Sequence, residues 1–93
     1  MFDKKKAYED KVKAQFDELG SRFNLAKSKA AEKSADLRID MSDKLEEFRV
    51  KQEDAQIHFD AMKHSAGDKW EELKQGMDKM ILDLENTWHE ITR

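Results

Sequence analysis

The chain has 93 residues, and its composition is 42% charged and 38% hydrophobic, with three glycines and neither proline nor cysteine. This length holds one domain at most, over residues 1–93. The composition is typical of long helices and coiled coils, and it excludes a sheet because the residues that make tight turns are scarce. Without cysteine, disulfides and thiolate metal sites are excluded and a reducing compartment is favoured. We therefore predict an all-α, cytoplasmic protein.

The formal net charge is −3, and it is distributed unevenly. Residues 1–35 carry nine Lys and Arg against six Asp and Glu, whereas residues 36–93 carry nine against fifteen. This gradient favours packing of the N-terminal third beside a later segment, of the same chain or of another. The charged start leads into no apolar stretch, so we expect no signal peptide, and the longest apolar run, residues 80–82, is too short to cross a membrane.

The first two thirds of the chain predict one long helix, from about residue 3 to about residue 65. Positions eleven apart are mostly apolar, and a repeat of about 3.67 residues per turn favours a straight or slightly right-handed bundle. The repeat connects Tyr8, Leu19, Ala30 and Met41; Val12, Phe23, Ser34 and Leu45; and Gln15, Ala26, Leu37 and Phe48. A second stripe of apolar residues lies beside this seam in the middle of the helix, at Ile39, Val50 and Ile57.

One pair of residues could divide this helix. Gly20 could end a helix and Ser21 could cap the next one, which would separate a short first helix. The apolar stripe crosses this pair without losing phase, and one interior glycine costs only about 1 kcal/mol. A continuous helix is therefore favoured over a break.

The last third predicts a shorter return helix, from about residue 69 to about residue 92. Apolar residues follow steps of three and four at Trp70, Leu73, Met77, Met80, Leu84 and Ile91, with Thr87 as the polar exception. Before it, Gly67 can adopt the left-handed conformation that ends a helix. Asp68 can then cap the return helix, with Glu71 completing a capping box. Together the two helices predict an antiparallel helical hairpin.

The two predicted helices differ greatly in length. At about 1.5 Å per residue, the long helix spans about 90 Å and the return helix only about 36 Å. The return helix can therefore cover residues 41–63 and no further, which leaves the N-terminal apolar stripe without a partner in its own chain. We predict that this stripe drives assembly into an oligomeric bundle, an antiparallel dimer above all, through Tyr8, Val12, Phe16, Leu19 and Phe23.

Two tryptophans belong to the same set of predicted contact residues. Trp70 occupies a seam position just after the turn and is expected to be a packing anchor. Trp88 lies at the edge of the seam, where it could be a core residue, an oligomer contact or a contact with another protein.

The residues that commonly carry chemistry do not form a site in the sequence. His58 and His64 are six apart and do not share a helix face, and His64 with Asp60 is too small a set for a stable zinc site. Adjacent carboxylates such as Glu46 and Glu47 diverge on a helix and cannot act together as acid and base. The basic cluster at residues 4–6 lacks an aromatic stacking platform. We expect no enzyme activity, metal or other cofactor, and no nucleic-acid partner.

Two segments of the chain resemble a known group of proteins. Residues 65–76 read Ser-Ala-Gly-Asp-Lys-Trp-Glu-Glu-Leu-Lys-Gln-Gly, a turn followed by Trp-Glu-x-Leu-Lys-x-Gly. This run is similar to the tail of small bacterial coiled-coil proteins that include cyanobacterial stress-induced ones, and residues 45–55 are similar in style. The chain departs from that group at Met80-Ile81, where its relatives tend to have Ala-Trp. The resemblance implies a coiled-coil class and a link to stress, without an activity.

Two functions agree with these features. The first is a non-enzymatic coiled-coil protein that acts by protein–protein contact, as a scaffold or as a regulator that docks on a partner. The alternative is an amphipathic stress protectant or membrane-surface helix, because eleven-residue amphipathic repeats also order on lipid surfaces. The aromatic residues of the seam favour self-packing over lipid binding, and hence the first function.

Overall fold

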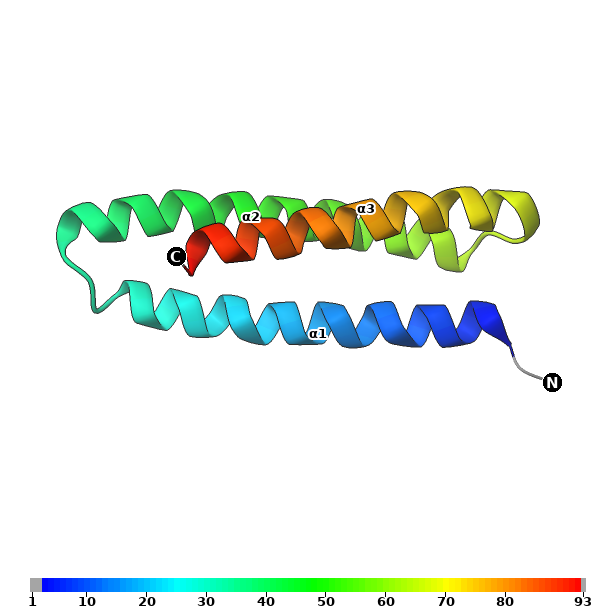
Figure 1. Ribbon diagram of the computed structural model, residues 1–93, viewed down its shortest axis with the longest axis horizontal. Helices are drawn as coiled ribbons and strands as arrows, with labels where there is room; N and C mark the ends of the chain where they lie inside the picture. The colour runs from blue at the N-terminus through cyan, green and yellow to red at the C-terminus, as the bar shows by residue number, and fades with distance from the viewer. Residues whose placement is uncertain (1–2, 93) are drawn as a thin grey trace.

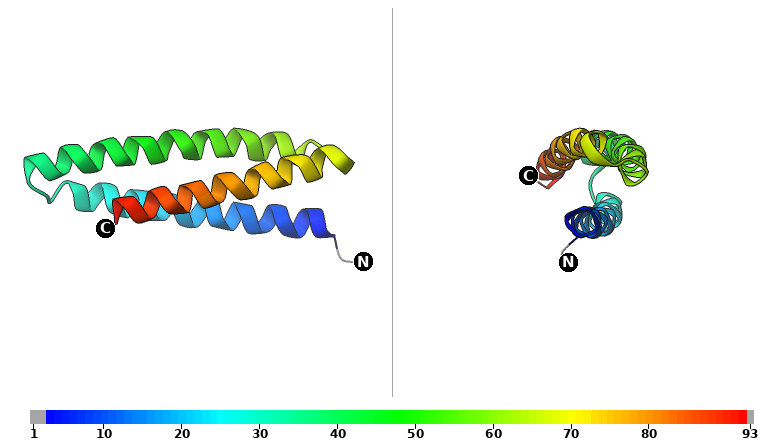
Figure 2. Two further views of the ribbon diagram at one scale, coloured as in Figure 1. Left: turned by 45° about the horizontal axis from the view of Figure 1, so that its top comes forward. Right: turned by 90° about the vertical axis from the view of Figure 1, so that its right-hand side faces the viewer.

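The structure, a computed structural model, describes residues 3–92 and forms three α-helices in a bundle of 53 × 20 × 18 Å (Figure 1). Helix α1 covers Lys4–Ala30, α2 covers Ala35–Lys63 and α3 covers Gly67–Ile91, and the described part of the chain contains no strand. Successive helices run antiparallel, and all three lie side by side along the same long axis (Figure 2). The prediction of an all-α protein is confirmed.

Helix α1 begins and ends with favourable local chemistry. The Asp3 side chain accepts a hydrogen bond from the backbone N–H of Lys6 at 3.2 Å and so caps the helix. Lys27 and Lys29 lie in the last turn, where positive charge stabilises the negative end of the helix dipole. The helix runs through Gly20 without interruption, as the phase of the apolar stripe predicted.

The prediction of one helix over residues 3–65 is wrong, because the chain reverses direction at residues 31–34. The N–H groups of Glu32 and Lys33 donate to the carbonyl oxygens of Lys29 and Ala30 at 3.1 Å, and Ser34 is extended before α2 begins. The reversal lets α1 fold back on the rest of its own chain. Burial stabilises each large apolar side chain by about 1.5–3 kcal/mol, which offsets the interruption of one helix.

The turn between α2 and α3 follows the prediction in one respect only. Gly67 has φ of +60°, the left-handed conformation that glycine adopts without strain. Asp68 does not cap α3, because the helix begins at Gly67 with Ala66 as its N-cap and makes no side-chain cap hydrogen bond. Asp68 lies inside the first turn instead, where its charge still favours the positive end of the helix dipole.

A single core connects the three helices. Four aromatic pairs cross between helices, with ring centroids 5.6–6.3 Å apart: Tyr8–Trp70, Phe16–Phe59, Phe23–Phe48 and Phe48–Trp88. Lys51 of α2 forms an ion pair with Asp83 of α3 at 3.2 Å. Helices α2 and α3 pack more closely together than α1 and α2 do. The bundle is therefore an α2–α3 hairpin against which α1 is laid.

Candidate protein interaction surface

Most of the residues predicted to contact another molecule lie in the core of their own chain. Val12, Phe16 and Leu19 are 1%, 7% and 2% exposed, and Tyr8 and Phe23 are half-buried against the same core. The assumption that this stripe lacks an intrachain partner is therefore wrong. Its reason is the reversal at residues 31–34, which supplies the partner surface from α2 and α3.

The two tryptophans lie at opposite ends of α3. Trp70 is 7% exposed and meets Tyr8 edge-to-face at 5.7 Å, so it is a packing anchor as predicted. Trp88 is half-buried, contacts Phe48, and has the guanidinium of Arg22 5.9 Å from its ring centroid. Trp88 is therefore partly a core residue and keeps some surface for other contacts.

The clearest apolar feature left on the surface is the outer α2 stripe, formed by Ile39, Val50 and Ile57. These side chains are 61%, 44% and 68% exposed. They are eleven and seven residues apart, and at about 100° per residue each lies within about 20° of the one before. From the sequence this stripe was expected beside the buried seam, but it lies on the opposite side of α2. Buried Phe48 is nine residues from Ile57, and nine residues at about 100° each make half a turn.

Acidic residues surround the outer α2 stripe. At about 100° per residue, five exposed carboxylates lie within about 60° of its centre line, and no Lys or Arg of α2 lies in the same sector. These carboxylates are Asp36, Asp43, Glu46, Glu53 and Asp54. Arg49, at the margin of the sector, pairs with Glu46 and Glu53, and its Nε donates to Glu46 at 3.1 Å. Within residues 3–92 the other three carboxylates form no ion pair.

The ionic state of this surface follows from these contacts. The hydrogen bond from Arg49 lowers the pKa of the Glu46 carboxyl, and the same bond raises the pKa of Arg49. On the flank that faces α3, burial lowers the pKa of Lys51, but hydrogen bonds to Glu47 and Asp83 raise it more, so the net shift is upward. These directions all favour the charged forms of Glu46, Arg49 and Lys51. The stripe is apolar with an acidic border.

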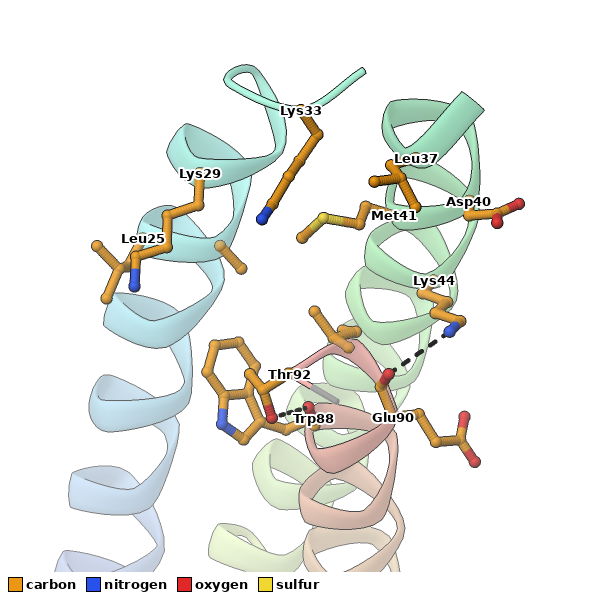
Figure 3. A pocket seen from close by; sticks show the side chains of 12 residues that line it. Leu25, Lys29, Lys33, Leu37, Asp40, Met41, Lys44, Trp88, Glu90 and Thr92 are labelled. Atoms are coloured by element: carbon orange, nitrogen blue, oxygen red, sulfur yellow. Dashed lines mark hydrogen bonds between the residues drawn. The ribbon is translucent and has the colours of Figure 1, made fainter. Parts of the chain in front are cut away.

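A second surface feature is the open-end groove, formed by Leu25, Leu37, Met41, Trp88 and Ile91 at the end of the bundle where α1 meets α2 (Figure 3). Helix α3 ends short of this connection, which leaves a cavity of about 430 Å³ between the three helices. Leu25 and Leu37 are 55% and 53% exposed there. Lys29, Lys33 and Lys44 line the groove together with Asp40 and Glu90, and Lys44 donates to the carbonyl oxygen of Glu90 at 3.5 Å.

Two of the three histidines make backbone contacts through their rings. A ring nitrogen of His58 lies 2.7 Å from the carbonyl oxygen of Leu73, and one of His64 lies 2.7 Å from that of Asp60. Between residues 3 and 92 there is no group of three His, Asp or Glu side chains that could hold a metal ion. Of the three described helices, none combines the length and the apolar character that crossing a membrane requires.

The fold and this surface define a small three-helix bundle with an apolar, negatively bordered outer face. No family model matches the chain, and neither a curated protein nor a solved structure is similar enough to it to count as a relative. The resemblance to small bacterial coiled-coil proteins therefore stays a prediction, and functional inference depends on the geometry of the chain itself.

Proposed function

We propose that this protein is non-enzymatic and acts by protein–protein contact, with the outer α2 stripe as its docking surface. The observation that carries this proposal is the alignment of Ile39, Val50 and Ile57 on a solvent-facing side of a helix whose opposite side is already buried. Single exposed apolar residues are ordinary, and the proposal depends on three of them sharing one solvent-facing side of α2. A scaffold or docking regulator needs such a surface and no catalytic group.

The partner that suits this surface is a cationic amphipathic helix. An apolar stripe on such a helix would cover Ile39, Val50 and Ile57, and its Lys or Arg side chains would meet the unpaired carboxylates Asp43 and Asp54. The stripe spans about 27 Å at about 1.5 Å per residue, so it matches a partner helix of about 18 residues. The charges set orientation and association rate, and the apolar contacts supply most of the affinity.

The alternative function, binding to an anionic membrane surface, has less support. The apolar positions of the eleven-residue repeat pack within the chain, and the carboxylates beside the outer α2 stripe would be repelled by anionic lipid. A cytoplasmic location and a role in stress belong to the same proposal. They are supported by the absence of cysteine and by the resemblance at residues 65–76.

Binding of a designed peptide tests the proposal. The probe is an 18-residue helical peptide with leucines along one side and lysines beside them, labelled for fluorescence anisotropy. We expect saturable binding that weakens as salt rises, and Ile57→Ser should raise the dissociation constant about tenfold. The matched control is Leu82→Ser, because Leu82 is 59% exposed but lies on α3, away from the stripe.

Two outcomes would overturn the proposal. One is an equal rise in the dissociation constant of the peptide for the Ile57 and Leu82 variants, which would mean that the peptide binds without using the stripe. The other is equal binding of a peptide in which glutamates replace the lysines, which would remove the charge argument. Vesicles of phosphatidylglycerol, used as a second probe, should not bind, and binding to them would favour the membrane-surface alternative.

A further inference from the structure

The connection between α1 and α2, residues 31–34, has a composition that suits a helix. Part of its backbone already has a helical conformation. Its sequence, Ala-Glu-Lys-Ser, contains neither glycine nor proline, and Ala31 already has helical angles, φ −63° and ψ −20°. Ser34 is extended, with ψ of 162°, yet its side chain makes no cap hydrogen bond to α2. The turn is thus held by the backbone hydrogen bonds of Glu32 and Lys33, without a side-chain cap bond at Ser34.

Straightening these four residues would join two halves of one apolar seam. In a continuous helix, positions 26, 30, 34, 37, 41 and 45 follow steps of three and four and therefore lie on one side. All but Ser34 are apolar. Leu37 lies on this side and yet is 53% exposed, because α3 ends before it can reach the connection. Leu37 therefore has the position of a core residue without the burial of one.

Helix α1 is the part of the fold that can be exchanged. It packs less closely on α2 than α3 does, and its contacts run to the α2–α3 hairpin: Phe16 to Phe59, Phe23 to Phe48, and the Tyr8 hydroxyl to Asp78. Each of these contacts could form equally well with the hairpin of a second copy. An exchange would therefore cost no packing.

We propose that two copies of this chain exchange their α1 helices. In each copy a continuous helix runs from residue 4 to residue 63, and α1 of one copy packs on the α2–α3 hairpin of its partner in the same antiparallel sense as within one chain. The two open-end grooves then meet at the centre, and the seam around Leu37 of one copy covers that of the other. Domain exchange of this kind keeps the contacts of the monomer. It adds new contacts only around residues 31–34, the hinge about which α1 moves.

The charges around the hinge agree with this arrangement. Lys29 precedes the hinge and Lys33 lies in it, and Asp36 and Asp40 follow it. An antiparallel crossing of two straight helices at the hinge brings the basic side of one copy beside the acidic side of the other. The outer α2 stripe lies on the opposite side of α2 and stays exposed in both copies. The exchange is thus independent of the docking proposed above, and a dimer would present two docking surfaces.

The test compares two substitutions of Ser34 by light scattering and small-angle X-ray scattering over a range of concentrations. Ser34→Ala favours the continuous helix, and we expect the dimer dissociation constant to fall about fivefold, because each dimer contains two hinges and Ser34 makes no cap hydrogen bond that the substitution would remove. Its maximum dimension should grow from the 53 Å of the monomer to about 90 Å or more. Ser28→Ala is the matched control, since Ser28 is an exposed serine inside α1.

Ser34→Pro should keep the protein monomeric, because the φ of −61° at this position suits proline, whereas proline inside a helix removes a hydrogen bond. Circular dichroism checks that this variant folds, and the pair Lys33→Gly with Ser34→Gly, which disfavours helix at the hinge, replaces it if it does not. A Ser34→Ala protein that stays monomeric overturns the proposal. A dimer that persists in Ser34→Pro or in the double glycine variant also overturns it. So does a dimer whose mass doubles while its maximum dimension stays that of the monomer.

Discussion

Phe23 of α1 stacks on Phe48 of α2, with ring centroids 5.9 Å apart and ring planes 13° apart. The two residues belong to different series of the eleven-residue repeat and meet only because the chain reverses between them. Trp88 of α3 also meets Phe48 edge-to-face, at 6.3 Å. Phe48 is fully buried and therefore lies at the point where all three helices meet.

Phe48→Ala should lower the free energy of unfolding by about 3–5 kcal/mol, because it removes the largest fully buried side chain and leaves a cavity between three helices. Urea unfolding followed by circular dichroism measures the change. Leu82→Ala is the control, since Leu82 is 59% exposed and its truncation should change the stability by about 0.5 kcal/mol at most. Similar losses in the two variants would show that Phe48 does not organise the core.

The all-helical fold and nearly all of the core could be read from the sequence, because helical periodicity identifies which residues share a side. Val12, Phe16, Leu45 and Phe48 were predicted on the seam and are buried. The polar exception of the return helix was also placed correctly. Thr87 is 2% exposed, and its hydroxyl donates to the Asp83 carbonyl oxygen at 2.9 Å and accepts a hydrogen bond from Lys51 at 3.0 Å.

The reversal at residues 31–34 could not be read from the sequence, because nothing local requires it. Ala, Glu and Lys are good helix formers, and Ser34 is the one residue there that prefers a helix start. The decisive gain is the burial of Phe16 and Leu19 against α2, which is a property of the tertiary structure. Missing this turn changed the expected partner of α1 from its own chain to another.

The outer α2 stripe was visible in the sequence, but its significance was not. Ile39, Val50 and Ile57 lie about half a turn from Phe48 on any α-helix, so the expectation that they flank the seam was an error of helical angle. Once α1 and α3 both pack on the buried side of α2, the stripe remains on the solvent side. The proposal that it is a docking surface depends on that packing.

Two interior glycines should respond in opposite ways to alanine. Gly20 lies in α1 with its nearest neighbour 3.9 Å from an added Cβ, so Gly20→Ala should stabilise the fold by about 0.5–1 kcal/mol through helix propensity. At Gly76 an added Cβ would lie 3.0 Å from the His58 ring, which is held by the Leu73 carbonyl oxygen. Gly76→Ala should therefore destabilise the fold by about 1–3 kcal/mol.

The His58 ring can be tested as the cause of this difference. In the double variant His58→Ala with Gly76→Ala, the close approach disappears, so the glycine substitution should cost less than it does alone. Thermal unfolding of the four proteins of this cycle gives the coupling energy. A coupling energy near zero would mean that helix α3 shifts freely at Gly76 and that the contact with His58 does not limit packing.

Tyr8 links α1 to α3 through its hydroxyl, which donates to the Asp78 carboxylate and lies 3.4 Å from the Lys74 carbonyl oxygen. Burial raises the pKa of Tyr8 well above its ordinary value, and the hydrogen bond to Asp78 raises it further. Above about pH 10 the unfolded chain releases this proton while the folded chain keeps it. The stabilising effect is therefore complete below about pH 10 and is lost as the pH rises beyond it.

Tyr8→Phe should lower the free energy of unfolding at pH 7 by about 1–2 kcal/mol, because it removes a hydrogen bond to a charged group. The variant should also lose stability less steeply above about pH 10, by less than the roughly 1.4 kcal/mol per pH unit of one whole proton, because water screens the half-exposed contact with Asp78. Urea unfolding at pH 8, 10 and 11 measures both effects. Lysines titrate in the same range in both proteins, so the difference between their curves isolates Tyr8, and parallel curves would show that its hydroxyl ionises as freely in the fold as in the unfolded chain.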